Sequence, residues 1–511
     1  MVAIIKNREI FKAFGGFLLC VTAITLSHWP LLNLPFFWDE AGYYVHAAWD
    51  LYSAGSLIPT SVVPEAHPPL IPIYVAIAGE IIGFTPTVAR SAMVLWSAMA
   101  LLGAYFFARR LTSPVGATAA TVLLGAYPIF FVQATLVQLD MPVTTLSIWA
   151  SWAVLKDRFS LAYFLLACAA LTKGTGFLTG VGLAIFVVIA DPLSRALLAK
   201  ARNLAFIPVL CFGVWLIVHW YLSGSIFGGS NFVEYNLLSL ITSPKRLATA
   251  AVLRLWHLTG HVGLWGLVLP SVAVGWVNRK KTWMKEAPLG RAALLVTCVG
   301  GIYLIAFTFI GGAVLARYML PVTALLIIFL ASAASSLLSR KFSGLVFLLA
   351  LGTFTMGLFS QPSYHTAFED TLMYADFVRL HQQAVAMAQQ QYTGQTFVTS
   401  WPATDELTKP YLGYVNEPLP IKQITDFSSS AVDSALANCH GECVVLAFDT
   451  QYEPSDSWMR PSRLLSFWKK AAGTIATRPG TTPEIIAHQN QLHLESALRM
   501  SPHFVAFFKK Q

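Results

Sequence analysis

The segment that decides the fold runs from Phe14 to Tyr44 and reads FGGFLLCVTAITLSHWPLLNLPFFWDEAGYY. Up to Phe37 it contains no Asp, Glu, Lys or Arg, and it exceeds the roughly 20 apolar residues that cross a bilayer as a helix. Basic residues precede the run, as in a signal peptide, but the run is too long and no small-residue cleavage site follows it. The sequence therefore predicts an uncleaved first span, with the acids Asp39 and Glu40 directly beyond its aromatic end.

The composition points to a membrane protein. Hydrophobic residues make up 56% of the chain and charged residues only 12%, whereas soluble domains carry roughly 25% charged residues. The net charge is +12 over residues 1–360 and −3 over residues 361–511. A basic chain can indicate nucleic-acid binding, but these basic residues stand between apolar runs, where they set membrane topology. We therefore do not expect nucleic acid as a partner.

Further apolar runs follow the first one. The candidate spans are residues 13–35, 87–108, 115–134, 141–155, 159–172, 174–190, 203–222, 260–277, 292–312, 319–338 and 342–359. Some are short, which is typical of broken helices inside a bundle. The stretch Leu70–Gly83 is also short and contains Glu80, so an interfacial or re-entrant helix is expected there. The pattern predicts an α-helical polytopic membrane protein with about eleven transmembrane helices.

The distribution of Lys and Arg supports this count of spans. With the N-terminus inside, 17 of the 23 Lys and Arg of residues 1–360 fall on inner segments, as the positive-inside rule requires. Eleven crossings then place the C-terminus outside, together with two sizeable loops at 36–86 and 223–259. The inner segments are too short for a nucleotide-binding domain, and no Gly-rich phosphate loop follows a strand. We therefore expect a transmembrane domain over residues 1–360 whose chemistry lies on the outer face.

Residues 361–511 are predicted to form a small soluble α/β domain on the non-cytoplasmic side. Helical patterns cover 366–392, 404–412 and 430–437, and strand patterns cover 396–401 and 443–448. Cys439 and Cys443 are separated by His-Gly-Glu. They can form a disulfide in an oxidising compartment, and a metal site is the alternative. The other four cysteines lie in apolar runs and are expected to be inert.

An amphipathic pattern follows the acids at the end of the first span. Asp39 is placed to cap a helix in which positions 41, 44, 45, 48, 51 and 52 form one apolar face. Asp39, His46 and Asp50 fall on the opposite face. The pattern predicts a helix in the membrane plane that presents its carboxylates to water. An interfacial loop with a capping Asp is the alternative.

Other polar residues stand near the ends of outer-side apolar runs. They are Glu65 and His67 before Pro-Pro, Asp140 in Gln-Leu-Asp-Met-Pro, Lys173 in Leu-Thr-Lys-Gly, and Arg317 and Tyr318 in Ala-Arg-Tyr-Met-Leu-Pro. Some have ordinary explanations, because a His before Pro-Pro is commonly a loop residue and Asp140 can cap its own helix. The two cations depart from the positive-inside trend, and a cation at such a place needs an anionic partner.

Carboxylates and cations thus gather on one side of the membrane, which suits group transfer from a phosphate carrier. A carboxylate can deprotonate an acceptor hydroxyl, and fixed cations can stabilise the charge of the departing phosphate. Phosphate is already a competent leaving group, so no strong general acid is required.

The order of these motifs resembles a known family. Asp-Glu after the first span, then His-Pro-Pro-Leu, Leu-Asp-Met-Pro, Leu-Thr-Lys-Gly and Arg-Tyr-x-Leu-Pro are similar to the polyprenyl-phosphate-sugar-dependent glycosyltransferases of the C-type fold. The branch is that of bacterial aminoarabinose transferases of lipid A and protein O-mannosyltransferases. The resemblance implies an inverting transferase that moves a sugar from polyprenyl phosphate to an acceptor hydroxyl of a glycan, lipid or protein. The implied setting is the lipid of a bacterial inner membrane, with the active site on its outer, periplasmic face.

The resemblance also assigns roles to residues. It implies that Asp39 is the catalytic base, with Glu40 as the neighbouring alternative, and that Asp140 is the second active-site acid. The implied substrate-binding residues are Glu65, His67, Lys173, Arg317 and Tyr318. In the aminoarabinose branch a Glu-Lys pair precedes Pro-Pro, whereas here His67 stands at the Lys position and Glu65 lies one residue further away.

Two further readings of the sequence stay open. A transporter or flippase of lipid-linked saccharides is the alternative function, although transporters tend to show repeats and ionisable residues near the bilayer midplane. Here no repeat is visible and the charges cluster at the outer rim. A divalent cation is compatible with the sequence, since hard ligands could come from Asp39, Glu40, Glu65 and His67.

Overall fold

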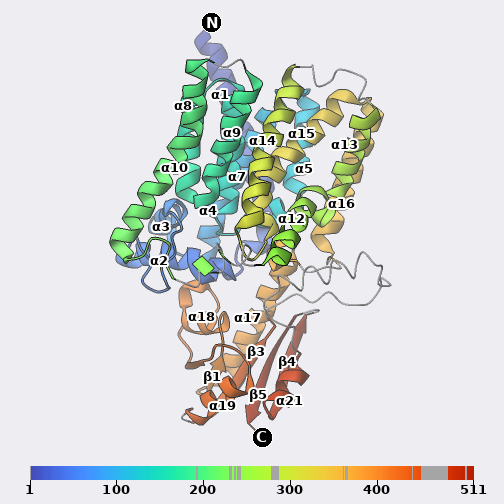
Figure 1. The fold of residues 1–511 in the computed structure, drawn as a ribbon. Helices are drawn as coiled ribbons and strands as arrows, with labels where there is room; N and C mark the ends of the chain where they lie inside the picture. The colour runs from blue at the N-terminus through green and yellow to red at the C-terminus, as the bar shows by residue number, and fades with distance from the viewer. Residues whose placement is uncertain are drawn as a thin grey trace.

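The computed structural model describes residues 2–191, 194–229, 233–234, 238, 243–277, 287–360, 362, 366–439, 441–449, 482–500 and 503–510. The helices form a bundle, and a smaller part with a β-sheet lies beyond one end of it (Figure 1). The N-terminus lies at the opposite end of the bundle from the C-terminus (Figure 1). The chain is therefore a mostly helical, multispan membrane protein with a C-terminal α/β part.

Six helices of the described chain are long and apolar enough to cross a membrane. They are α1 (Val2–His28), α4 (Pro86–Ala108), α10 (Arg195–Ser223), α14 (Ala287–Phe309), α15 (Leu320–Leu337) and α16 (Arg340–Phe359). A seventh span results if α12 (Pro244–Thr259) and α13 (Trp265–Val277), which meet at a bend of 107°, are taken as one. The backbone explains this bend, because Val262 and Gly263 between the two helices have positive φ angles.

The remaining expected spans contain shorter helices. These are α5 (Pro114–Ala126), α6 (Pro128–Gln133), α7 (Asp140–Leu155), α8 (Phe159–Thr172) and α9 (Phe177–Ala190). Pro128 divides the expected span 115–134, because proline lacks an N–H group and forces Tyr127 into an extended conformation. α7 packs between α4 and α8, and α9 packs against α10 and α14. The helices therefore match the predicted positions, while the count of eleven crossings stays a prediction.

The loop after α1 lies at the end of the bundle that faces the C-terminal part (Figure 1). It contains a π-helical turn at Glu40–Tyr44, α2 (Val45–Ala54) and α3 (Leu70–Ile82). α3 has 13 residues, too few to cross a bilayer, and it packs against α2. Of the second expected outer loop, residues 230–232, 235–237 and 239–242 lie outside the described part of the chain.

The predicted loop helix is present, but two expectations about its polar face are wrong. Asp39 does not cap the helix with its side chain, since its carboxylate binds an arginine instead. His46 and Asp50 are buried rather than open to water. The C-terminal part covers His46, and Asp50 accepts the backbone N–H groups of Thr60 and Ser61 at 2.7 and 2.8 Å.

The C-terminal part has the predicted mixture of helices and strands. Its elements are α17 (Met373–Gln391), β1 (Thr396–Thr399), α18 (Ala403–Thr408), β2 (Ile421–Gln423), α19 (Ser429–Ala437), β3 (Cys443–Phe448), α21 (Pro483–Gln489), β4 (Leu492–Met500) and β5 (His503–Lys510). The sheet has the order β2-β1-β3-β5-β4, in which β1 runs parallel to β2 and β3 while β5 runs antiparallel to β3 and β4. Cys439 and Cys443 form the predicted disulfide.

Contacts with α2 hold the C-terminal part against the membrane-spanning part. One nitrogen of the buried His46 lies 3.3 Å from the carboxylate of Asp405, and the other bonds to the hydroxyl of Tyr411 at 2.5 Å. The ring of Tyr411 also stacks on Trp49 with centroids 4.6 Å apart. The C-terminal part therefore lies directly against the loop that carries Asp39.

The topology can be tested with reporters. We expect alkaline phosphatase fused after residue 511 to be active, because an odd number of crossings places the C-terminus opposite an inner N-terminus. The same enzyme inserted after Asp157, in the short turn between α7 and α8, should be inactive and serves as the control. Activity measured in intact cells with the opposite pattern would overturn both the topology and the outward placement of the site.

Candidate active site

Arg317 is the centre of the candidate site. It lies in a 3-10 turn at the start of α15, and its side chain is only 1% exposed. Its guanidinium donates to the carboxylate of Asp39 and to the side-chain oxygen of Gln138. It also lies 3.8 Å from a carboxylate oxygen of Asp140 and 3.4 Å from one of Glu369. A buried guanidinium needs such partners, and three separate chain segments supply them here.

A second cation, Lys173, joins the cluster from the extended break after α8. Its ammonium donates to Asp140 at 2.6 Å and lies 4.1 Å from the ring centroid of Tyr318. The latter distance is that of a cation–π contact. Asp140 therefore lies between the two cations, and the expectation that these outer-side cations have anionic partners is confirmed.

The members of the cluster differ in their access to solvent. The side chain of Asp39 is 36% exposed, whereas those of Asp140 and Glu369 are 4% and 1% exposed. Tyr44 also faces the cluster, and burial, followed by the charge of Asp39, raises the pKa of its phenol well above the ordinary range. Asp39 is thus the carboxylate of this cluster that an incoming molecule can reach.

Several buried polar atoms of the cluster make no hydrogen bond to the described residues. They are Nε2 of Gln138, Oδ2 of Asp140, Nε of Arg317 and Oε1 of Glu369. Buried polar atoms in proteins are usually satisfied, and exceptions mark functional sites or places for a bound group. Two of these atoms, Nε of Arg317 and Oε1 of Glu369, face each other in the ion pair of 3.4 Å, whereas Nε2 of Gln138 and Oδ2 of Asp140 remain without a hydrogen bond.

Glu369 was not among the residues selected from the sequence. It lies in the turn Phe368–Asp370 between α16 and α17, and burial raises the pKa of its carboxyl to about 7 although Arg317 opposes this. Its neighbour Asp370 lies 2.9 Å from His261, at the bend between α12 and α13. The sequence did hold a signal, since Glu369-Asp370 follows the last expected span as Asp39-Glu40 follows the first.

Glu40 has surroundings quite different from those of Asp39. It is fully buried, lies 2.8 Å from Arg90 of α4, and accepts the backbone N–H of Val137 at 2.7 Å. Arg90 in turn donates to the backbone carbonyls of Leu34 and Pro35. These bonds tie the loop that carries Asp39 to α4 and to the segment leading into α7. Glu40 therefore occupies an anchoring position.

Glu65 and His67 form a second polar pair, with 3.3 Å between their side chains. Tyr43 donates to the backbone carbonyl of Glu65 at 2.7 Å. The His67 ring lies edge-on to Tyr43 and Tyr44, at centroid distances of 5.4 and 5.5 Å. Since Tyr44 also faces Arg317 and Asp39, it stands between this pair and the main cluster.

The residues suggested as ligands of a divalent cation do not lie together in the structure, because they bind separate partners. Asp39 binds Arg317, Glu40 binds Arg90, and Glu65 pairs with His67. Within the part of the chain that the structure describes, no three His, Cys, Asp or Glu residues are grouped to hold a metal ion.

Comparison with known proteins gives a partial family match and a full-length fold match. Residues 66–222 match the family described as dolichyl-phosphate-mannose-protein mannosyltransferase. This segment includes His67, Asp140 and Lys173 but neither Asp39 nor Arg317. No curated protein sequence matches the chain.

Two crystal structures of ArnT from Cupriavidus metallidurans have a similar fold. The apo structure has a TM-score of 0.52 at 14% identity and covers 97% of this chain and 98% of its own. The structure bound to undecaprenyl phosphate has a TM-score of 0.54 at 14% identity and covers 96% and 98%. At this identity the likeness shows the fold, and it extends over both the helical bundle and the C-terminal α/β part.

The family match over residues 66–222 and the shared fold agree with the motifs noted in the sequence. The resemblance is thereby confirmed over residues 66–222. Residues 66–222 are thus similar to this mannosyltransferase family, and the fold of the whole chain is similar to that of ArnT.

Proposed function

We propose that the protein transfers a sugar, with inversion, from polyprenyl phosphate to an acceptor hydroxyl on the membrane face where the C-terminal part lies. This face is expected to be the outer face of a bacterial inner membrane. The contact between Asp39 and Arg317 carries the proposal, because a partly exposed carboxylate there adjoins a buried cation. A base and a phosphate-binding group are thus within reach of one substrate. The acceptor belongs to a glycan, a lipid or a protein.

The proposed reaction is a single displacement. The acceptor oxygen forms a bond to the anomeric carbon while Asp39 takes the hydroxyl proton. The bond between that carbon and the phosphate oxygen breaks, and its electron pair leaves with polyprenyl phosphate. Because the new bond forms opposite the one that breaks, the configuration is inverted and no covalent glycosyl-enzyme is required.

Arg317 and Lys173 are the proposed phosphate-binding groups. The planar guanidinium of Arg317 can hold a phosphate through two parallel hydrogen bonds, and both cations stabilise the charge that the leaving group gains. Asp140 and Tyr318 position Lys173, as their contacts of 2.6 and 4.1 Å suggest. An incoming phosphate competes with Asp39 for the guanidinium and so frees the base when the donor is bound.

The remaining candidates have supporting roles in this proposal. Glu40 positions the loop that carries Asp39, through its bonds to Arg90 and Val137. Glu65 and His67 lie beyond Tyr44 and are proposed to contact the sugar. The charged cluster lies at helix ends near the C-terminal part rather than midway along the bundle, where transporters place their sites. This position favours transfer over transport.

The first test replaces the proposed base. Asp39→Asn should lower turnover on the order of 10²–10⁴-fold, because the acceptor proton has no base to receive it. Binding of undecaprenyl phosphate should stay equal or become tighter, since a competitor for Arg317 is removed. Both can be measured on purified protein, with the lipid-linked sugar that accumulates on gene deletion as donor.

Asp376→Asn is the matched control, because Asp376 lies on α17 with an exposed side chain paired to Arg379. It loses the same charge at a distance from the cluster and should retain its activity. If Asp39→Asn keeps more than about a tenth of wild-type turnover, well inside the expected loss, Asp39 is not the base.

The second test concerns the phosphate site. Arg317→Lys keeps the charge but loses the planar pair of donors, so undecaprenyl phosphate affinity and turnover should fall together, each on the order of tenfold. Arg379→Lys, on the exposed face of α17, is the control and should change neither. Unchanged affinity in Arg317→Lys would remove Arg317 from phosphate binding.

A third test uses the raised pKa of Glu369. An unfolded Glu titrates near 4.3, whereas folding raises the pKa of Glu369 to about 7. Between these values the folded protein holds a proton that the unfolded chain releases, so stability should fall by up to about 4 kcal/mol as the pH rises through this window.

Glu369→Gln removes this titration and should flatten the dependence of the melting temperature on pH between about 4.5 and 7.5. Glu495→Gln, a partly exposed residue 4.0 Å from Lys509, should retain the wild-type slope. Parallel melting curves for wild type and Glu369→Gln would show that burial does not perturb this carboxyl.

A further inference from the structure

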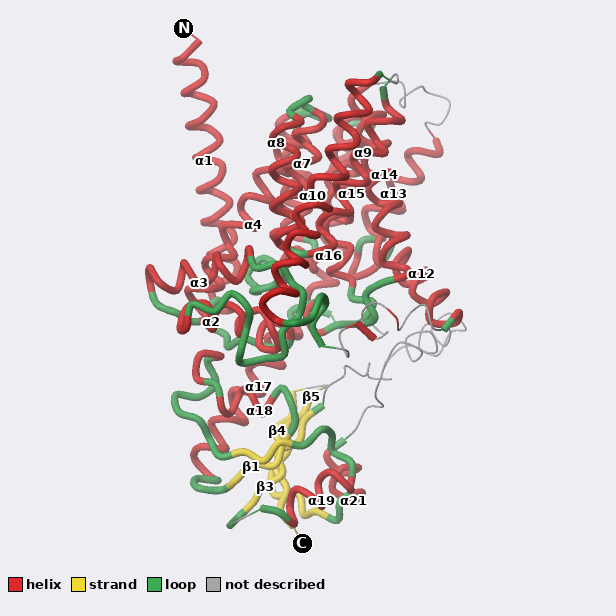
Figure 2. The backbone as a smooth tube through the Cα atoms, turned by 60° about the vertical axis from the view of Figure 1, so that its left-hand side comes forward, coloured by secondary structure: helices red, strands yellow, loops and turns green. Residues whose placement is uncertain are grey.

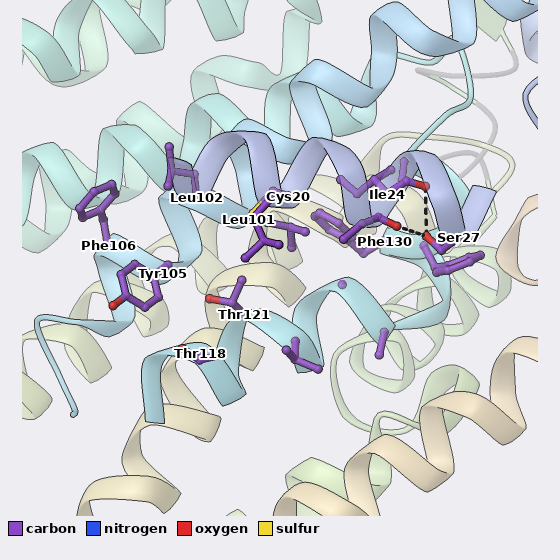
Figure 3. Close-up of a pocket in the computed structure, with 18 of the residues that line it drawn as sticks. Cys20, Ile24, Ser27, Leu101, Leu102, Tyr105, Phe106, Thr118, Thr121 and Phe130 are labelled. Carbon is purple, nitrogen blue, oxygen red and sulfur yellow. Dashed lines mark hydrogen bonds between the residues drawn. The ribbon is translucent and has the colours of Figure 1, made fainter. Parts of the chain in front are cut away.

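A large apolar cavity lies between α1, α4 and α5, at the side of the bundle. Its volume is about 1020 Å³. Figure 3 shows Cys20 of α1, Leu101 of α4 and Thr121 of α5 facing this common space. The half of α1 towards the N-terminus stands apart from the other helices (Figure 2).

The cavity follows α1 over most of the membrane. Its lining on this helix extends from Lys12 to His28, and sixteen residues of α-helix rise about 24 Å. One leaflet contributes only about 15 Å of hydrocarbon. The cavity is therefore long enough for an extended acyl chain.

The walls favour hydrocarbon over water. The hydroxyls of Thr118 and Thr121 donate to backbone carbonyls of their own helix at 3.1 and 2.9 Å. Their hydrogen bonds are therefore formed within the protein and need no polar ligand. Water in an apolar cavity lacks hydrogen-bond partners, and an empty cavity forfeits dispersion contacts along its whole lining. An acyl chain supplies these contacts.

The two ends of the cavity differ in charge. Lys12 of α1 and Arg109, which follows α4, line the end away from the C-terminal part. At the other end the ring of His28 has partners for its neutral form, because Nε2 donates to the carbonyl of Phe131 at 2.8 Å and Nδ1 lies 3.0 Å from the hydroxyl of Ser27. A pair of cations at one end only favours a lipid whose negative headgroup lies there.

We propose that this cavity binds an anionic phospholipid, with an acyl chain along α1 and the phosphate between Lys12 and Arg109. The site is distinct from the proposed donor site, whose Arg317 lies at the start of α15 near the C-terminal part. The bound lipid fills the space between α1 and α4, the two helices that flank the loop carrying Asp39. It therefore stabilises the first span against the bundle.

The test counts lipids on the purified full-length protein by native mass spectrometry, with phosphatidylglycerol or phosphatidylcholine as the probe. Wild type should retain phosphatidylglycerol in preference to phosphatidylcholine. In the double variant Lys12→Gln/Arg109→Gln, phosphatidylglycerol affinity should fall on the order of tenfold, because each cation near the surface attracts anionic lipid.

Arg110→Gln is the matched control. Arg110 is also an exposed cation at this end, but it does not line the cavity and donates to the carbonyl of Leu155 at 3.1 Å. This variant should bind phosphatidylglycerol as wild type does. An equal loss in Arg110→Gln and in the double variant would overturn the site, since it would indicate general surface charge.

A second variant tests the acyl-chain part of the site without changing charge. A Cβ at Gly16 meets only Leu102, at 3.5 Å, so Gly16→Leu fits the fold and extends into the cavity. It should lower phosphatidylglycerol binding although both cations remain. Undiminished binding overturns the proposal, as does a lipid-free dimer, which would show that a second copy covers this face.

Discussion

The burial of Arg317 is the constraint on which the arrangement of the site depends. A guanidinium withdrawn from water costs several kcal/mol unless anions and hydrogen-bond acceptors surround it. Asp39, Asp140 and Glu369 meet this requirement from three segments that are far apart in the sequence. Three segments therefore lie together at the start of α15, namely the loop after α1, the start of α7 and the turn after α16. The turn after α16 leads into the C-terminal part, which is thus tied to the site through Glu369.

Two sets of contacts hold the loop that carries Asp39 in place. On the membrane side, the buried pair of Glu40 and Arg90 ties it to α4. On the other side, His46 and Trp49 of α2 contact Tyr411 of the C-terminal part. A reacting group gains most when its surroundings fix its position before the substrate arrives. Asp39 lies within this frame and still keeps 36% of its side chain exposed.

The sequence predicted the parts of this arrangement that follow from local chemistry. Hydropathy located the helices, and the unusual position of two outer-side cations led to Lys173 and Arg317 with their acidic partners. It selected Asp39 as the base and kept Glu40 as the alternative, because it could not show that Glu40 binds Arg90, fifty residues later in the chain. It did not select Glu369, whose contact with Arg317 depends on how the chain folds back after α16. The strands β4 and β5 were also missed, since β5 joins the sheet by pairing with β3, which is distant in sequence, and β4 joins it only through β5.

The pairing of Asp39 with Arg317 also suggests how the proposed reaction is ordered. While the carboxylate of Asp39 accepts a hydrogen bond from the guanidinium, it is held by that partner. When a donor phosphate binds the guanidinium, the carboxylate of Asp39 is released from this contact and can accept a hydrogen bond from the acceptor hydroxyl. On the proposed mechanism the base thus becomes effective only when the leaving group is already in place. Competition between two anions for one buried cation is sufficient for this order, and no movement of the C-terminal part is required.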